Sequence, residues 1–570
     1  MKNLVLSLLP VFARQAKAGF VRKTKRTAQV QEQFLRSLLR AHQNTEVGRK
    51  YRLRDIKTVD QFRQRMPILP YSAYEPYIER IAQGEQNILT PDPVVYLNLT
   101  SGSTGKQKMI PVTRRSQRVS QRINQVSIGF AVEEAKKYGV SIGKMLLTSS
   151  VQGIGQTTGG IDYGPVSAST VRQSNPLYRQ LFAQPYDALQ IVDSLARHYM
   201  CLLFSLQDPQ LSVIAATFPI LALRLCDYLE SYAEDLIRDL ETGAIAPWLN
   251  LEPELRAKLE QLFSATPERA AELRQILKTE GRLTPELVWP NLSFIITARG
   301  GTSNFYFERF PSYFGDTPVF GGIYASSESA FGTYYEFNND NAILAIENAF
   351  YEFIPEDQWH VDQPKTLLAE EVKPHERYRV LVTNYNGLYR YDIGDVVEVL
   401  GFHEKAPLIA FRHRLGGLLS STTEKTTEFH AIQVMQRLQQ DFKLSLEDFC
   451  ITLSEDEIPA HYLVNIELTP NYILSNPQAF LERFDFRLKE IHLSYANKRP
   501  DQVPAPRLRI LAPGSFATLR QRLMQRGITD SQLKLPHITE DRQFLAGLTV
   551  EQEVRLPEET ELELAQIAVK

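Results

Sequence analysis

The sequence predicts an α/β protein with a large N-terminal domain, whose sheets are covered by helices, and a smaller C-terminal α+β domain. Two observations support this prediction. Short apolar runs rich in β-branched residues alternate with long helical stretches over most of the chain, as in sheets packed between helices. The pattern then changes after Val396, where we expect shorter strands.

The composition is that of an ordinary folded protein. The 570 residues are 43% hydrophobic and 23% charged, which argues against a disordered or fibrous chain. At roughly 150 residues per domain the length suggests three or four units, although two remain possible. The 64 basic and 66 acidic residues nearly cancel, so the sequence lacks the basic excess of a nucleic-acid-binding protein.

Cysteine usage indicates a reducing, cytoplasmic compartment. Cys201, Cys226 and Cys450 are far apart and odd in number, so a fully paired disulfide framework is excluded and buried thiols are expected. The chain has no CxxC or HExxH pattern, which makes a zinc site improbable.

The N-terminus predicts an amphipathic helix. No apolar run reaches the 20 or so residues that span a bilayer. Pro10 interrupts the apolar stretch Leu4–Phe12, and basic residues follow at helical spacing. A cleaved signal peptide is the weaker reading, and contact with a membrane surface is a minor alternative.

The first hundred residues read as helices followed by a strand. Apolar periodicity predicts helices at Gln31–His42, Val59–Gln64 and Tyr74–Ile81. Val94–Leu99 reads as a strand that enters a glycine-rich turn, and Arg114–Tyr138 as a long helix closed by Gly139. We expect a strand, loop and helix unit here.

Further elements continue the alternation. Strands are expected at Lys144–Ser149, Leu292–Thr297, Ala342–Ile346, Phe350–Ile354 and Tyr378–Thr383. Helices are expected at Ile214–Thr242 and Glu252–Glu280. In the smaller domain we expect, after the Thr-rich turn Ser420–Thr427, helices at Glu428–Phe442, Pro477–Leu493 and Ser515–Gly527, and strands at Tyr462–Leu468 and Leu508–Leu511.

The glycine-rich turn Thr100–Lys108 (TSGSTGKQK) is suited to binding a phosphate. Glycines let backbone amides converge on an anion, and hydroxyls and a lysine add donors and positive charge. The turn is not a Walker A loop, because Thr100 stands where glycine is needed and Gln107 where Ser or Thr is needed. A plain hairpin remains the alternative.

The turn and its companion motifs resemble one enzyme family. Leu99–Lys108 is similar to the phosphate-binding signature of acyl-adenylate-forming enzymes. Tyr324–Glu328 (YASSE), Tyr389–Asp395 (YRYDIGD) and Lys425–Glu428 (KTTE) resemble, in order and separation, signatures of the auxin-responsive Gretchen Hagen family of acyl-acid amido synthetases. The resemblance covers nearly the whole chain.

Glu328 is the candidate for the metal. A carboxylate after hydroxyl-bearing Ser326 and Ser327 can hold Mg²⁺ and contact a phosphate, and the resemblance implies that role. It also implies that Tyr324 lies against adenine, while a core-packed aromatic residue is the alternative. By the same resemblance ATP is held by Ser101, Gly102, Ser103, Thr104, Gly105 and Lys106.

Other candidates come from the later motifs. The resemblance assigns the ribose to Asp395, whose carboxylate can accept from both hydroxyls, although a turn-forming aspartate is the alternative. It assigns phosphate charge to Lys425, whose alternative is a solvated lysine. Looser candidates for nucleotide contacts are Thr297, Gly300 and Arg414. Lys534, in Ser531–His537, resembles a family lysine that reaches the active site in one domain orientation, which makes it a catalytic candidate beside Lys425 and Glu328. Asp392 and Arg299 depart from the plant pattern and receive no role.

The resemblance implies that an acid is adenylated with ATP and Mg²⁺ and then transferred to an amine such as an amino acid. It divides the chain into an adenylating domain, residues 1–419, and a mobile lid, residues 420–570. A thioester-forming ligase that uses coenzyme A and a non-catalytic ligand-binding relative are the rivals. The sequence identifies neither the acid, the amine nor the oligomeric state.

Overall fold

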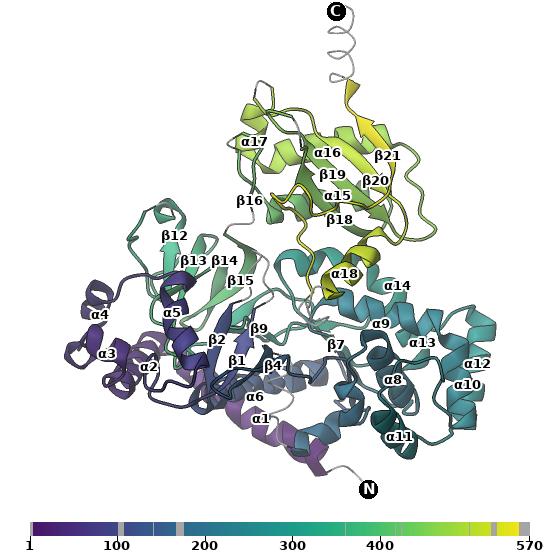
Figure 1. Ribbon diagram of the computed structural model, residues 1–570, viewed down its shortest axis with the longest axis horizontal. Coiled ribbons are helices and arrows are strands. Elements are labelled where there is room, and N and C mark those ends of the chain that lie inside the picture. Colours follow the sequence, from purple (N-terminus) through teal and green to yellow (C-terminus); the bar gives the residue numbers. More distant parts are fainter. Residues whose placement is uncertain are drawn as a thin grey trace, which may run out of the picture. The chain divides into compact units, whose positions relative to one another are not determined.

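The computed structural model describes residues 4–100, 108–140, 142–166, 176–359, 361–415, 418–422, 424–455, 457–500, 502–525 and 533–557. Helices and strands alternate along the chain, which confirms the α/β class (Figure 1). The chain forms two compact units. The first comprises Met1–Gly300 with Phe310–Phe411, and the second Gly301–Arg309 with Arg412–Lys570. The backbone therefore passes between the units three times.

The strands of the first unit form three sheets within the described residues. A parallel sheet has the order β3 (Met145–Leu147), β6 (Val213–Ala215), β7 (Phe294–Ile296), β8 (Val319–Phe320). A mixed sheet has the order β2 (Met109–Thr113), β1 (Val94–Leu99), β5 (Asp162–Pro165), β4 (Gly155–Gln156). A seven-stranded sheet has the order β12 (Phe350–Pro355), β13 (Arg377–Thr383), β14 (Tyr391–His403), β15 (Ala406–Arg414), β11 (Ala342–Leu344), β10 (Ala330–Tyr334), β9 (Ile323–Ala325).

Helices and short 3₁₀ turns surround these sheets. The α-helices are α1 (Leu4–Thr24), α2 (Thr27–His42), α3 (Glu46–Lys50), α4 (Val59–Arg65), α5 (Tyr71–Ala82), α6 (Arg114–Lys137), α8 (Ser194–Leu206), α9 (Pro219–Ser231), α10 (Ala233–Thr242), α11 (Pro253–Leu262), α12 (Pro267–Glu280), α13 (Pro285–Val288) and α14 (Pro311–Phe314). The 3₁₀ turns are η1 (Leu53–Asp55), η2 (Pro176–Leu181), η3 (Tyr186–Gln190) and η5 (Glu356–Gln358).

The seven-stranded sheet lies at the centre of the core. Consecutive residues of β12 are buried along nearly its whole length, and since neighbouring side chains point to opposite faces, both faces of the sheet are covered. On one side Gln31 of α2 donates to the carbonyls of Ile346 and Ala349 at 2.6 and 2.8 Å. The helix predicted at Gln31–His42 is confirmed, with Leu35, Leu38 and Leu39 buried.

The N-terminal helix is confirmed as an amphipathic element that packs on α6. Gly129 of α6 makes a close approach possible, because a Cβ there would lie 2.5 Å from the carbonyl oxygen of Ala13. Phe20 is fully buried, whereas Val11 and Phe12 are about 60% exposed. Among the described helices, none has both the length and the apolarity needed to cross a bilayer.

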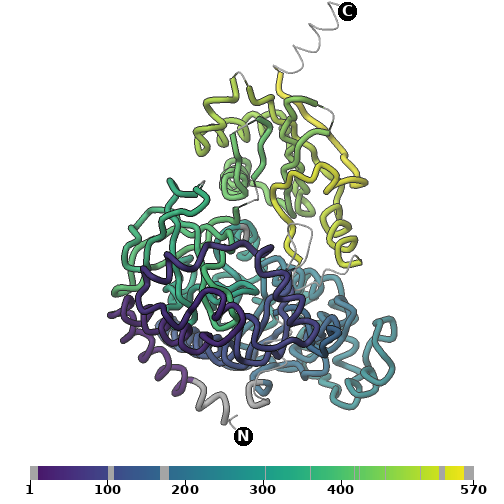
Figure 2. Tube along the Cα trace, turned by 60° about the vertical axis from the view of Figure 1, so that its left-hand side comes forward, coloured from purple at the N-terminus to yellow at the C-terminus, as the bar shows by residue number. Residues whose placement is uncertain are grey.

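The second unit contains a four-stranded sheet. Its chain segment is coloured green to yellow in Figure 2. Its strands are β18 (Leu446–Leu453), β19 (Tyr462–Leu468), β20 (Arg507–Leu511) and β21 (Val550–Arg555), and its helices α15 (Glu428–Phe442), α16 (Pro477–Ile491), α17 (Leu493–Lys498) and α18 (Ser515–Gln525). A small hairpin, β16 (Leu418–Leu419) with β17 (Thr426–Thr427), precedes α15.

The segment η4 (Gly301–Arg309) belongs to this second unit. Tyr306 donates to Asp448 at 3.1 Å, and Arg309 pairs with Glu447 at 2.8 Å. The ring of Phe305 lies 5.1 Å from that of Phe449. These contacts fasten a stretch from the middle of the chain to the start of β18.

Several predicted elements were wrong in part. The helix Arg114–Lys137 follows β2, a strand that the sequence reading missed because it lies directly after the glycine-rich turn and contains Pro111. Ile214 belongs to β6 rather than to a helix. Glu252–Glu280 is two helices, because Pro267 starts α12 and cannot continue α11.

The expectation of shorter strands after Val396 was also wrong. β14 is 13 residues long and β15 is 9. Gly394 and Gly401 suggest breaks, but the strand accommodates them. Opposite β13, Leu381 pairs with Asp392 and Arg379 with Val396, so four steps on β14 match two on β13 and form a bulge.

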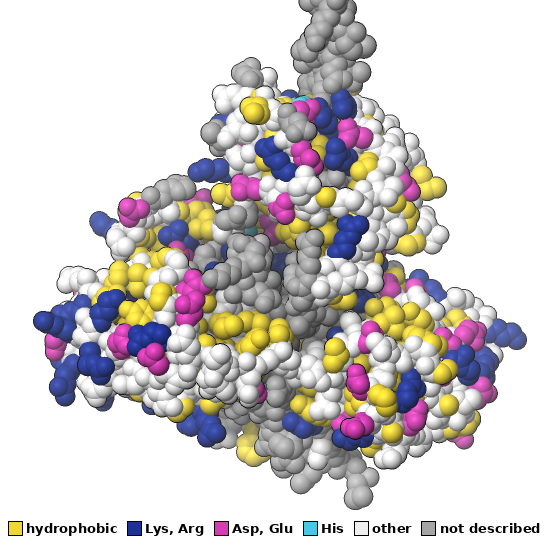
Figure 3. Space-filling model, in the orientation of Figure 1, with side chains coloured by type: hydrophobic (Ala, Val, Ile, Leu, Met, Phe, Trp, Pro, Cys, Tyr) yellow, Lys and Arg dark blue, Asp and Glu magenta, His cyan; other side chains and the backbone are white. Residues whose placement is uncertain are grey.

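The three cysteines are fully buried free thiols, as predicted. Burial raises the pKa of Cys201 to about 12, so this thiol stays protonated near neutral pH. On the face shown in Figure 3, basic and acidic side chains are interspersed, in keeping with the near balance of the total charge.

Candidate active site

The glycine-rich turn joins two antiparallel strands. Leu99 of β1 pairs with Met109 of β2, the amide of Thr100 donates to the carbonyl of Lys108 at 3.0 Å, and the amide of Lys108 donates to the hydroxyl of Thr100 at 3.1 Å. The predicted phosphate contacts at Ser101, Gly102, Ser103, Thr104, Gly105 and Lys106 lie outside the described residues. The position of the site is therefore given by the stem of the turn, that is, the paired ends of β1 and β2.

The motif Tyr324–Glu328 lies against this stem. It comprises the end of β9 and the start of the connection to β10. The hydroxyl of Ser327 donates to the carbonyl of Leu99 at 3.1 Å, and the side chain of Asn98 donates to the carbonyl of Ser327 at 3.2 Å. Two motifs more than 200 residues apart in sequence are thus fastened to the same end of β1.

Glu328 is buried, with 3% of its surface exposed. One carboxylate oxygen accepts from the hydroxyl of Ser326 at 2.8 Å, and the other from the phenol of Tyr391 at 3.3 Å. Asn384 donates to the backbone carbonyl of Glu328 at 2.8 Å. Each carboxylate oxygen retains acceptor capacity, so the side chain could still ligate a cation.

This environment fits Mg²⁺ better than a metal held by protein alone. Mg²⁺ commonly binds one or two carboxylates and completes its shell with phosphate oxygens and water. Within the described residues, no group of three or more His, Cys, Asp or Glu side chains could hold a metal ion. Glu328 with a nucleotide phosphate would supply the usual ligand types.

Asp395 and Tyr324 are hydrogen-bonded to each other. The phenol of Tyr324 donates to Asp395 at 3.0 Å, and both side chains are buried. Asp395 follows Gly394, whose φ of +77° lies in the left-handed region, within the bulge of β14. Bulges often redirect side chains beside active sites. Here the bulge brings the third motif to the second.

The turn after β7 borders the same aromatic group. The ring of Tyr324 lies 5.1 Å from Phe331 and 5.7 Å from Phe411. Gly300 has a φ of +86°, and a Cβ there would lie 3.0 Å from the carbonyl oxygen of Phe411, so only glycine fits well. Arg299, to which no role was assigned, pairs with Asp340 at 2.9 Å.

Thr297 lies at the end of β7 and is almost fully buried. Its amide donates to the carbonyl of Phe320 at 3.1 Å. Its hydroxyl has no hydrogen-bond partner among the described residues. A buried hydroxyl of this kind is costly unless something binds it, and the edge of a parallel sheet at the carboxyl ends of its strands is where α/β proteins bind nucleotides.

The remaining candidates belong to the second unit. Lys425 is exposed at the end of the turn between β16 and β17. Lys534 is exposed between buried Leu533 and Leu535. Arg414 is half-buried at the last position of β15. Their roles rest on the resemblance.

Two residues of the site escaped the sequence reading. Tyr391 donates to Glu328. It lies inside the motif Tyr389–Asp395, so its position in that motif could have marked it as a candidate. Phe411 borders both Tyr324 and Gly300, but a single aromatic residue within a strand gives no such signal. Both act by shaping the surroundings of predicted residues.

Arg390 is a structural residue. Its guanidinium makes two hydrogen bonds to Glu352, at 2.9 and 3.0 Å, and another to the carbonyl of Met66 at 2.8 Å. The arginine and the glutamate are both buried. Asp392, two residues after Arg390, accepts from the amide of Gly394 at 3.0 Å within the bulge of β14. Burial raises the pKa of Asp392 above its ordinary value, although the nearby Arg379 opposes this effect.

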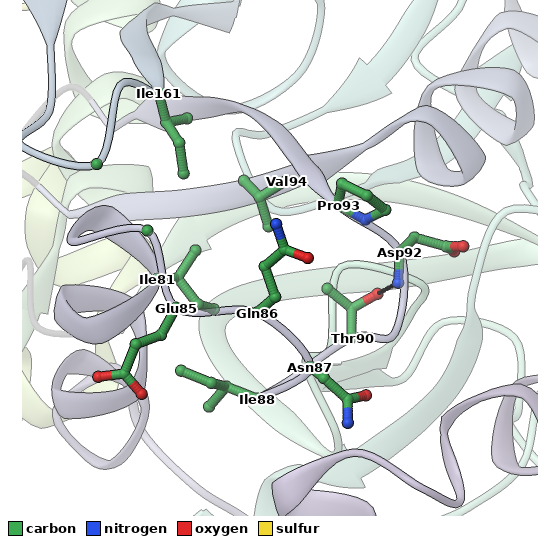
Figure 4. A pocket seen from close by; sticks show the side chains of 12 residues that line it. Ile81, Glu85, Gln86, Asn87, Ile88, Thr90, Asp92, Pro93, Val94 and Ile161 are labelled. Atoms are coloured by element: carbon green, nitrogen blue, oxygen red, sulfur yellow. Dashed lines mark hydrogen bonds between the residues drawn. The ribbon is translucent and has the colours of Figure 1, made fainter.

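A cavity of about 190 Å³ lies at the other end of β1 (Figure 4). Ile81, Ile88, Val94 and Ile161 line it, and the hydroxyl of Thr90 at its edge accepts from the amide of Asp92 at 3.3 Å. Val94 and Leu99 are five residues apart on one strand, which is about 17 Å. The cavity is thus separate from the motifs.

Comparison with known proteins finds the same family along most of the chain. Residues 16–319 match the GH3 family N-terminal domain, 342–414 its central domain and 429–543 its C-terminal domain. The chain is 28% identical over 548 residues to jasmonoyl–L-amino acid synthetase JAR4 of Nicotiana attenuata, covering 90% of this chain and 91% of that protein. It is 26% identical over 552 residues to indole-3-acetic acid-amido synthetase GH3.17 of Arabidopsis thaliana, covering 89% and 90%.

Solved structures share the fold. The AtGH3.15 acyl acid amido synthetase in complex with 2,4-DB superposes with a TM-score of 0.84 at 23% identity, covering 96% of this chain and 98% of that one. A 2-hydroxyisobutyryl-CoA ligase in the postadenylation state has a TM-score of 0.52 at 11% identity, covering 93% and 90%. At these identities the likeness concerns the fold alone.

Proposed function

The chain belongs to the GH3 family, and on that premise we propose that it is an ATP-dependent acyl-acid amido synthetase. It adenylates a small carboxylic acid and then transfers the acyl group to an amino acid. In the first step the carboxylate of the acid attacks the α-phosphorus of ATP, and pyrophosphate leaves. In the second the amino group attacks the carbonyl of the acyl-adenylate, and AMP leaves.

The observation that supports this proposal most strongly is the meeting of three motifs. Ser327 is hydrogen-bonded to the end of β1, Glu328 is hydrogen-bonded to Tyr391, and Tyr324 is hydrogen-bonded to Asp395. An adenylation site needs these functions together, because positioning and charge stabilisation dominate a reaction that requires no covalent enzyme intermediate.

In this proposal each group has one task. Asp395 accepts hydrogen bonds from the ribose, and Tyr324 and Phe411 provide an apolar edge for adenine. Thr297 and Gly300 border the base, and the turn Ser101–Lys106 receives the phosphates. Lys425, assisted by Arg414 and Lys534, neutralises charge that develops at the α-phosphate as the acid attacks.

Glu328 would hold Mg²⁺, which when bound neutralises phosphate charge. Replacing Glu328 with Gln keeps the size of the side chain and removes its charge. We expect the Mg²⁺ concentration for half-maximal activity to rise about tenfold or more. Titration of activity against Mg²⁺ measures this shift. Glu336→Gln is the control, because Glu336 lies just after β10, and its Mg²⁺ dependence should match that of the wild type. An unchanged Mg²⁺ dependence in Glu328→Gln would exclude the carboxylate from the metal site.

The two units take different parts in this proposal. The first unit binds ATP and the acid, and the second acts as a mobile lid that brings its basic residues to the nucleotide. The three buried free thiols support a cytoplasmic location for the reaction.

ATP–pyrophosphate exchange tests the proposal directly. The purified chain is incubated with labelled pyrophosphate, ATP, Mg²⁺ and a panel of carboxylic acids that begins with jasmonate and indole-3-acetate, the acids in the names of its relatives. Acid-dependent exchange is expected, and its absence with every acid would defeat the proposal.

The nearest rival is a thioester-forming ligase with the same first step. The two activities are distinguished by incubating the enzyme and the accepted acid with either mixed amino acids or coenzyme A and measuring the mass of the product. An amide product is expected. A thioester as the sole product would favour the rival, and a protein that binds ATP without any release of AMP would be a non-catalytic relative.

A further inference from the structure

Lys425 has an unusual backbone conformation for a lysine. Its φ is +57°, in the left-handed region that residues with a Cβ seldom adopt. Its side chain is exposed, whereas its neighbours Glu424 and Thr426 are buried. A non-glycine residue stays in such a conformation only where the surrounding structure holds it.

The side chain of Glu424 holds the turn from inside. One of its oxygens accepts from the amide of Ser421 at 2.5 Å, and the other from the amide and the hydroxyl of Thr422, both at 3.0 Å. Glu424 is 2% exposed. A single buried carboxylate thus satisfies three donors of the turn, each of them partly buried.

Tyr462 of β19 fastens this carboxylate to the core of the second unit. Its phenol oxygen lies 2.6 Å from Glu424, 2.8 Å from the hydroxyl of Thr426 and 3.0 Å from the carbonyl of Leu419. Leu419 and Thr426 are the paired residues of β16 and β17. The phenol therefore contacts both strands of the hairpin and the carboxylate between them.

The charge of Glu424 is compatible with this burial. Desolvation by burial raises its pKa, but the hydrogen bonds from Tyr462 and from the amides of Ser421 and Thr422 together outweigh that effect. The pKa of Glu424 consequently lies below its ordinary value, and the side chain is an anion that only accepts. It is occupied with the turn rather than available to a substrate.

We propose that Glu424 and Tyr462 are positioning residues, which act on the adenylation step by fixing the turn that presents Lys425. This inference rests on the proposed function, in which Lys425 stabilises charge at the α-phosphate. A flexible lysine loses much of its effect on a transition state when its backbone moves by an ångström. The buried pair Glu424 and Tyr462 thereby fixes the backbone position of the exposed Lys425.

Tyr462→Phe tests this proposal, because it removes the phenol oxygen and keeps the ring. We expect the turnover number for pyrophosphate exchange to fall about tenfold, with the KM for ATP changed less than twofold, if the lysine acts mainly in the transition state. Tyr495→Phe is the matched control. Tyr495 is equally buried in the same unit, and its ring stacks on that of Tyr462 at 5.8 Å. Its phenol donates to Asp485 at 2.7 Å, so the variant keeps this stacking and loses a hydrogen bond that does not involve the turn.

A double-variant cycle separates positioning from a general structural effect. If Tyr462 acts through Lys425, then Tyr462→Phe should not lower turnover further in a Lys425→Ala background. Effects that multiply, or an equal loss in Tyr495→Phe, would overturn the proposal. Glu424→Asp is expected to recover part of the turnover that Glu424→Ala loses.

Trypsin provides a readout that needs no enzymatic activity. Cleavage after Lys425 requires the turn to open, so it should be at least about tenfold faster in Tyr462→Phe than in the wild type or Tyr495→Phe. If exchange is absent for all acids but this cleavage accelerates, the proposed function fails while the fixation of the turn holds. Equal cleavage rates in all three proteins would overturn the fixation itself.

Discussion

In the first unit the two candidate carboxylates are buried, and each accepts from a tyrosine, Glu328 from Tyr391 and Asp395 from Tyr324. In the second unit the candidate lysines are exposed, and the buried pair of carboxylate and phenol, Glu424 with Tyr462, lies behind Lys425 instead of beside a ligand. The same chemical pair therefore has two uses in our proposal. In the first unit it prepares groups that would bind the nucleotide directly, and in the second it supports the turn that carries Lys425.

This difference leads us to expect different costs of substitution. Changes around the first site should affect stability or nucleotide affinity, because its groups are embedded in the central sheet. Changes at the exposed lysines should affect rate with little effect on folding, because few contacts are lost. The following substitutions are arranged from the largest expected effect to the smallest.

Arg390→Met should have the largest effect on folding. It leaves Glu352 buried, and among the described residues Arg63 and Thr366 are then the side chains that still bond to it. We expect a loss of about 3 kcal/mol in the free energy of unfolding, measured by urea denaturation. Arg377→Met is the control, since Arg377 is one-third exposed and 3.9 Å from Glu398, and it should change stability by less than about 0.5 kcal/mol. Similar losses in the free energy of unfolding of both variants would show that the buried ion pair of Arg390 contributes no more to stability than an exposed one.

Lys425→Ala should lower the rate of exchange about 100-fold, equivalent to about 2.7 kcal/mol of transition-state stabilisation. The free energy of unfolding should stay within about 0.5 kcal/mol of the wild type. Lys443→Ala is a close control, because Lys443 is also exposed and also has a positive φ, +49°. Exchange in that variant should be unchanged, and a rate loss equal to that of Lys425→Ala would remove the special role of Lys425.

Asp395→Asn should weaken nucleotide binding. It replaces the carboxylate that, in our proposal, accepts from the ribose hydroxyls with an amide, and we expect the KM for ATP to rise about tenfold. The wild type should discriminate ATP from 2′,3′-dideoxy-ATP, and the variant should lose most of this discrimination. If the variant discriminates as well as the wild type, the aspartate does not bind the ribose.

The smallest effect concerns the stability of the second unit in acid. The pKa of Glu424 is lowered in the folded state, so its contribution to stability is present above the unfolded pKa of about 4.3 and is lost as the pH falls through the lower folded value. Thermal unfolding between pH 3 and 5 should therefore depend less on pH in Glu424→Gln than in the wild type. Equal slopes would mean that the carboxylate titrates without affecting folding.

Much of the fold was predictable because local signals agreed with tertiary packing. Glu428–Phe442 and Tyr462–Leu468 have the predicted bounds. Thr427 caps the first, and the second is a mostly apolar, largely buried run interrupted by Asn465 and Glu467. The failures were local as well. β6 is only three residues long and precedes a helix closely, so its apolar residues merged with the helical pattern.

The sequence allowed candidate residues to be named but not the way they pair. Motif order made Glu328 and Asp395 candidates, because such chemistry is tied to short signatures, and their roles stay predictions. Their partners Tyr391 and Tyr324 are set by sheet register and by the bulge of β14. Register and bulges depend on which strands become neighbours, and no single segment encodes that choice.

The passage of Gly301–Arg309 into the second unit limits how far the chain is modular. A fragment that starts at Arg412, or at the boundary expected near residue 420, would lack Tyr306, Phe305 and Arg309. Asp448 would lose a buried donor, and the rings of Phe449 and His537 would lose the neighbouring ring of Phe305. Grafting the second unit onto another protein would therefore also require the transfer of Gly301–Arg309 from the middle of this chain.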